Sequence, residues 1–250
     1  MTRTIKGEQL DLLMEQASEA LAKTEYAEAE RLADRALHMA RSADDFERMA
    51  RICLPLMEAR RQRLQLALDA GQEGGVQVRQ SVVPDEVPEP GCYLFQPPLV
   101  GADARRLRLA ALEADVPVAV ICREPFTQLR LCPIVAIGQA TVRARIEPPA
   151  DPEHPDLSWF AHALEQLGDE AIDSVDTGLD LDRQVDALLA RLDAVPDHEK
   201  LHQALEATCR ALDRETRDRP TRGGSRRQRP IADDGEGTLD GGAEEVDDAA

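Results

Sequence analysis

The chain has 250 residues, of which 42% are hydrophobic and only 3% aromatic, and its formal net charge is −18. This length suffices for one medium domain or two small ones with an aliphatic core. The negative charge argues against nucleic-acid binding through the body of the protein, and few aromatic side chains are available to stack on bases.

The sequence also lacks the signals of membrane insertion and secretion. No apolar run approaches the ~20 residues that cross a bilayer, and the first residues have no hydrophobic core of a secretory signal. The five cysteines are an odd number without a CxxC pair, which predicts neither a disulfide framework nor a zinc knuckle. We therefore expect a protein of the reducing cytoplasm without a cofactor, and the preference for Arg over Lys is typical of GC-rich bacteria.

The N-terminal segment predicts a helical hairpin. Apolar residues recur at helical spacing over residues 10–21, and after a break at residues 23–25 they recur again over residues 26–41. Small or aromatic residues stand where two such helices would touch: Ala17, Tyr26, Ala29, Ala33, Ala36 and Leu37.

This pattern resembles a tetratricopeptide repeat hairpin over residues 10–41. It departs from the family in lacking a Trp in the first helix and in having Arg41 where a Pro is usual. Such hairpins stack and bind other chains, so the resemblance implies a protein partner and an interaction surface that includes Tyr26, Arg31 and Arg35.

A third helix is predicted to start near Asp44 and Asp45, whose carboxylates suit a helix N-terminus. It should end before Gly71, and the interior Pro55 predicts a kink or a division into two short helices. No second full repeat follows. The hairpin is therefore expected to pack on the rest of the chain or on a partner.

From residue 76 the pattern changes to alternating strands and helices. The expected strands are residues 76–78 with 81–83, 92–95, 116–122, 133–138 and 141–147, and the expected helix, capped by Asp103, is 102–114. Strand, helix and buried strand form a βαβ unit with parallel strands, whereas the last two strands are close enough for a hairpin at the sheet edge. The sheet is therefore predicted to be mixed.

Three further helices are expected to cover this sheet. One carries an apolar stripe over residues 157–167 and ends at Gly168, the second covers residues 181–192, and the third is capped by Asp197 and covers residues 201–212. The following 35 residues are charged and rich in Gly, so we expect a disordered tail. Its Arg run, residues 217–229, is interpreted as solvated, with contact to nucleic acid or acidic protein as the alternative.

The predicted fold class is thus α/β, with α+β as the alternative. We expect a TPR-like helical domain over residues 1–75, an α/β domain with C-terminal helices over residues 76–215, and the disordered tail over residues 216–250.

An HExxH motif, His198-Glu199-x-x-His202, is the first chemical candidate. On a helix its two imidazoles could chelate zinc while the Glu polarises water. We reject this reading because Lys200 adds a positive charge and no third ligand follows at the required spacing. A zinc hydrolase is retained only as a remote alternative.

The carboxyl ends of the predicted parallel strands are the second candidate, because ligands bind there in open α/β sheets. The residues at these ends are Gly101, Asp103, Arg105, Arg123 and Glu124. The turn over residues 96–103 has one glycine and two prolines, so it is neither a GxGxxG turn nor a P-loop. The alternative is that Asp103 only caps a helix and Arg123 and Glu124 form a solvated pair.

Cys122 and Cys132 are candidate nucleophiles, but neither has a His nearby in sequence, and buried structural thiols are the simpler interpretation. We therefore expect a non-enzymatic interaction or scaffold protein that uses its N-terminal helical surface. The alternative is an enzyme or small-ligand-binding protein with its site at the strand ends.

Overall fold

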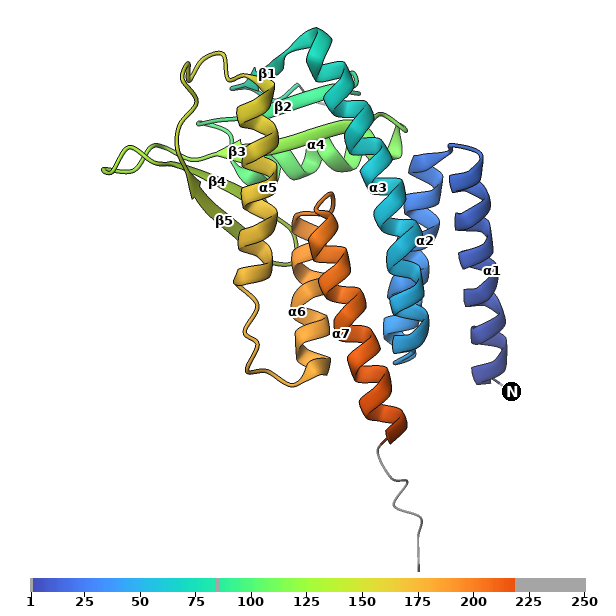
Figure 1. Ribbon diagram of the computed structural model, residues 1–250. Helices are drawn as coiled ribbons and strands as arrows, with labels where there is room; N and C mark the ends of the chain where they lie inside the picture. The colour runs from blue at the N-terminus through green and yellow to red at the C-terminus, as the bar shows by residue number, and fades with distance from the viewer. Residues whose placement is uncertain (1, 84–85, 219–250) are drawn as a thin grey trace, which may run out of the picture. The chain divides into compact units, whose positions relative to one another are not determined.

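The computed structural model describes residues 2–83 and 86–218, with side chains from residue 7 onward, and this part of the chain forms seven helices and five strands (Figure 1). The helices are α1 (Thr2–Ala22), α2 (Tyr26–Ser42), α3 (Phe46–Gly74), α4 (Gly101–Glu113), α5 (Leu157–Asp173), α6 (Leu181–Ala194) and α7 (Glu199–Asp218). The strands are β1 (Val76–Arg79), β2 (Gly91–Phe95), β3 (Val118–Arg123), β4 (Cys132–Ile137) and β5 (Thr141–Ile146). Of the predicted tail, residues 216–218 belong to α7, and the rest, with most of the Arg run, lies outside the described residues.

The predicted helical hairpin is present as α1 and α2. Ala17, Ala33 and Ala36 are at most 1% exposed, so small side chains do stand where the helices approach closely. Helix α3 starts as predicted: the carboxylate of Asp45 accepts a hydrogen bond from the backbone N–H of Arg48 at 3.1 Å.

Helix α3 is continuous for 29 residues, so the predicted end before Gly71 is wrong. Of the two outcomes predicted at Pro55, a kink or a division into two short helices, the division is excluded. Pro55 removes one hydrogen bond, but the buried face of α3 packs against α2 and α7 and offsets that loss. Gly71 does not end α3 but allows the helix to pack closely against β2, because a Cβ atom there would lie 2.8 Å from Sγ of Cys92.

The five strands form one mixed sheet in the order β1-β2-β3-β4-β5. β1, β2 and β3 are parallel, which confirms the βαβ unit formed by β2, α4 and β3. β4 and β5 are antiparallel neighbours, and β5 alternates between exposed and buried residues at the edge, as predicted. Residues 81–83, predicted to extend the first strand, lie outside it.

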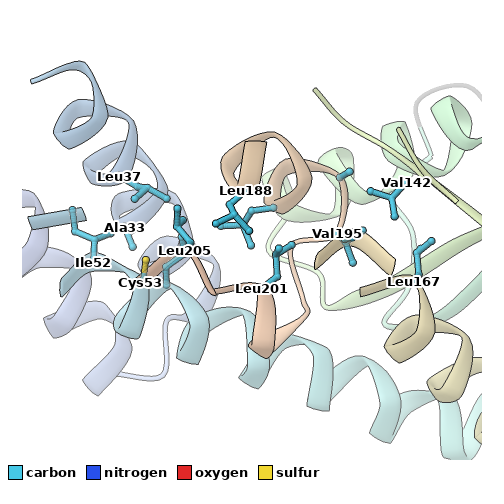
Figure 2. Packing of buried hydrophobic residues seen from close by; sticks show 14 of the residues in the cluster. Ala33, Leu37, Ile52, Cys53, Val142, Leu167, Leu188, Val195, Leu201 and Leu205 are labelled. Atoms are coloured by element: carbon cyan, nitrogen blue, oxygen red, sulfur yellow. The ribbon is translucent and has the colours of Figure 1, made fainter. Parts of the chain in front are cut away.

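The two faces of the sheet have different covers. Helix α4 packs on one face around Tyr93 and Phe95, and the other face shares a continuous hydrophobic core with the remaining helices. Figure 2 shows this core running from Leu37 and Ile52, past Leu205 of α7, to Leu167 of α5. The boundary predicted at residue 75 thus falls at the end of α3, and hydrophobic packing continues across it.

Candidate functional site

The sheet opens between β3 and β4. Their ladder consists of two residue pairs, Cys122 with Val135 and Arg123 with Ile134, whereas β4 and β5 are paired over six. Beyond these pairs the strands separate, so Val120 and Ile137 are not partners across the ladder. The carbonyl of Ile137, which has no partner in β3, accepts a hydrogen bond from Arg105 at 3.3 Å. We call this opening the sheet fork.

A cavity of about 230 Å³ occupies the sheet fork. Its walls come from α3, α4, the facing strands β3 and β4, α5, the last residue of α6, and the α6–α7 loop, residues 195–198. Aliphatic side chains such as Leu64, Leu68 and Leu164 form most of the wall. An apolar wall with a few polar groups is the usual composition of a small-molecule site.

Helix α4 presents one face to the cavity, formed by Gly101, Ala104, Arg105 and Arg108. Gly101 is required here, because a Cβ atom would lie 2.9 Å from Cγ1 of Ile137. The small residues bring the helix close to β4, and the two arginines follow on the same face because they are four and seven residues further on. Arg105 also forms an ion pair with Asp193 at 2.7 Å.

The end of α6 and the α6–α7 loop are held against the sheet and α5 by two glycines. A Cβ atom at Gly138 would lie 2.5 Å from the backbone nitrogen of Ala194, and one at Gly168 would lie 2.1 Å from Cγ of His198. Gly168 is therefore not the predicted end of a helix, since α5 continues to Asp173. It is a contact point at which only hydrogen leaves room for the His198 ring.

Asp197 is the main polar group of the cavity. It does not cap the last helix as predicted, because α7 begins at Glu199 and, within the described residues, the Asp197 carboxylate has neither a hydrogen bond nor an ion pair. Asp197 is half-buried and lines the cavity. Burial raises the pKa of Asp197, although the positive charge of Arg108 opposes the rise.

Arg108 is the counterpart of Asp197 on α4. One of its nitrogens donates to the backbone carbonyl of Asp193 at 2.8 Å, and among the described residues it forms no ion pair. Burial lowers the pKa of Arg108, and Asp197 partly restores it. A half-buried carboxylate and a half-buried guanidinium thus line one cavity, and each has hydrogen-bonding groups that water or a ligand can satisfy.

The predicted strand-end residues fall into two groups. Gly101 and Arg105 line the cavity, whereas Asp103, Arg123 and Glu124 do not. Asp103 is the third residue of α4 and accepts from the backbone N–H of Val100 at 3.0 Å. Arg123 is buried and donates to Gln96, and Glu124 forms an ion pair with Arg143 at 3.2 Å.

The histidines of the HExxH motif have separate partners. The His202 ring is buried, with Nδ1 donating to the carbonyl of His198 at 3.0 Å and Nε2 3.4 Å from a nitrogen of Arg60. The His198 ring lies between two carboxylates of α5, those of Glu165 and Asp169. Glu199 is exposed. The two imidazoles therefore do not face a common point as a zinc-chelating pair would.

The predicted interaction surface is partly engaged within the chain. Arg31 donates to the carbonyl of Leu112 at 2.8 Å and so ties α2 to α4. Tyr26 is half-buried, whereas Arg35 is exposed. Arg35 lines a separate cleft of about 1070 Å³ between α1, the α2–α3 turn and the end of α7.

The two cysteines weighed as nucleophiles are both buried. Burial raises the pKa of Cys122 to about 12, so its thiol stays protonated at neutral pH.

None of the helices in the described residues has the length and apolar character that crossing a membrane requires.

Sequence reasoning missed Asp197 and Arg108 as members of a site. Arg108 had a detectable signal, because it shares a helix face with Gly101 and Ala104, and small residues mark a face that packs closely. Asp197 had none, since an acid just before an amphipathic helix has the same appearance as a cap.

No protein-family model matches the chain, and no curated protein or solved structure is significantly similar to it.

Proposed function

We propose that the protein binds a small polar molecule in the cavity of the sheet fork. The observation that carries this proposal is the half-buried Asp197 carboxylate, which lines the cavity without a hydrogen bond from the described chain. A group whose charge is disfavoured by burial lowers stability, and such a cost is typical of binding sites.

The polar groups of the cavity define the ligand class. Asp197 calls for a hydrogen-bond donor, such as an amine or hydroxyl group, and Arg108 for an acceptor, such as a carboxylate or carbonyl oxygen. The aliphatic wall favours a short hydrocarbon part between these groups. A volume of about 230 Å³ limits the ligand to a small metabolite.

The test is a thermal-shift screen with small amines, amino acids, hydroxy acids and simple carboxylates. We expect at least one compound to raise the Tm of the wild type, because a ligand at 100 times its Kd stabilises the folded state by about 2.7 kcal/mol. Asp197→Asn should abolish this response. Without ligand the variant should be as stable as the wild type or more stable, since it removes a half-buried charge whose pKa is raised by desolvation.

Asp173→Asn is the matched control, because Asp173 is an exposed residue that does not line the cavity. It should leave the ligand response unchanged. A ligand response that persists in Asp197→Asn, or a screen in which no compound of these classes stabilises the wild type, would count against the proposal.

We propose protein–protein interaction as a second function, on the strength of the cleft lined by Arg35. Its floor includes Leu10, Met39 and Phe46, so apolar area is available beside charged side chains. The cleft is separate from the sheet fork, and the two functions do not exclude each other.

Deletion of residues 1–75 is unsuitable as a test of this second proposal, because it would remove α3 from the shared core. The surface substitution Arg35→Glu avoids this problem. Crosslinked partners recovered with the wild type should be lost with Arg35→Glu and kept with Asp197→Asn. Equal recovery with all three proteins would contradict a role for the cleft.

A further inference from the structure

Two acidic side chains of α5 converge on the histidine that precedes α7. Glu165 and Asp169 are four residues apart and so share one helix face. An oxygen of Glu165 lies 3.4 Å from Nδ1 of His198, and one of Asp169 lies 3.3 Å from Nε2. One ligand atom from each of the three side chains falls within 4.8 Å of the others.

The His198 ring is fixed but incompletely bonded. The residue is 5% exposed, and Nε2 has no hydrogen-bond partner in the described part of the chain, despite its proximity to Asp169. The close contact with Gly168 holds the ring in place. A buried imidazole nitrogen without a partner, 3.3 Å from an oxygen of Asp169, is an observation independent of the acidic pair itself.

The cluster already attracts a positive charge. The ammonium group of Lys200 lies 2.6 Å from Glu165 and 2.9 Å from Asp169. Imidazole nitrogen and carboxylate oxygen are the ligand types of first-row divalent transition metals such as Zn²⁺ and Co²⁺. We propose that Glu165, Asp169 and His198 bind one such ion, in competition with the ammonium group of Lys200.

This site uses the HExxH motif differently from a zinc hydrolase. His202 takes no part, since both of its ring nitrogens have partners within the chain. Three protein ligands leave room for water or a bound molecule on the metal. Glu165 and His198 also line the cavity of the sheet fork, so an ion here would be in its wall. The proposal nevertheless stands without any ligand in that cavity.

Metal-free protein is titrated with Zn²⁺ by calorimetry and with Co²⁺ by visible absorption. The wild type should bind one equivalent. Glu165→Gln combined with Asp169→Asn should weaken binding at least roughly tenfold, and these side chains are exposed enough for the variant to fold. Lys200→Ala should tighten binding roughly tenfold, because it removes the competing cation.

His202→Gln distinguishes this site from an HExxH centre, since it should leave the affinity for both metals unchanged. The matched control for the acidic pair is Asp182→Asn with Asp186→Asn, which removes a second acidic pair at the same spacing, on α6, paired with Arg41. It should also leave binding unchanged. Absence of binding in both the wild type and Lys200→Ala, or loss of binding in His202→Gln, overturns the proposal.

Discussion

His202 is an ionisable side chain whose pKa is shifted by its buried surroundings. Its ring is 1% exposed and contacts both the carbonyl of His198 and the guanidinium of Arg60. Burial and the nearby positive charge of Arg60 lower the pKa of His202 to about 3. The ring is therefore neutral in the folded protein at every pH where the protein would normally be studied.

This low pKa makes stability depend on pH. Protonation favours the unfolded chain, in which the pKa of His202 returns to about 6.5. The contribution of His202 to the free energy of unfolding is complete above pH 6.5 and falls as the pH is lowered toward 3, by up to about 1.4 kcal/mol per pH unit. The free energy of unfolding, measured with urea between pH 7.5 and 5, should depend less steeply on pH in His202→Gln than in the wild type. The difference in slope should correspond to about one proton fewer taken up on unfolding. An identical pH dependence in the variant would mean that folding does not lower the pKa of His202.

The elements of the fold were predictable where a local pattern determines them. Asp45 caps α3, and β5 alternates between exposed and buried residues, because both features depend on side chains close in sequence. Glycine is common at helix ends, so the sequence predicts helix ends at Gly71 and Gly168. Each is instead a contact with a residue distant in the chain, Cys92 or His198, which no local pattern contains.

Substitution of these glycines tests that interpretation at the scale of the helix. Gly168→Ala should lower the free energy of unfolding by about 2 kcal/mol or more, because the new Cβ atom would overlap the buried His198 ring. Gly74→Ala, also in a helix but with no atom within 4 Å of the new Cβ, should change it by less than about 1 kcal/mol. Chemical denaturation measures both values. Equal effects would show that helix propensity, and not the contact with His198, decides the outcome.

At the scale of the whole described unit, the candidate site was only partly predictable. The carboxyl ends of the parallel strands directed attention to Gly101 and Arg105, which do line the cavity. The cavity itself depends on where β3 and β4 separate and on the α6–α7 loop, which is separated in sequence from the last strand, β5, by two helices, α5 and α6. Such an arrangement follows from packing among distant segments and leaves no pattern in any one of them.

The continuous core predicts that the N-terminal helices and the sheet unfold together. Ile52 in α3 is fully buried, whereas the single Trp, Trp159, is in α5, which covers β4 and β5. Ile52→Ala should lower the free energy of unfolding by about 3 kcal/mol. In one cooperative unit, urea transitions followed by Trp159 fluorescence and by helical circular dichroism should coincide and shift equally. If residues 1–75 were an independent domain, the fluorescence transition would stay unchanged while the circular dichroism became biphasic.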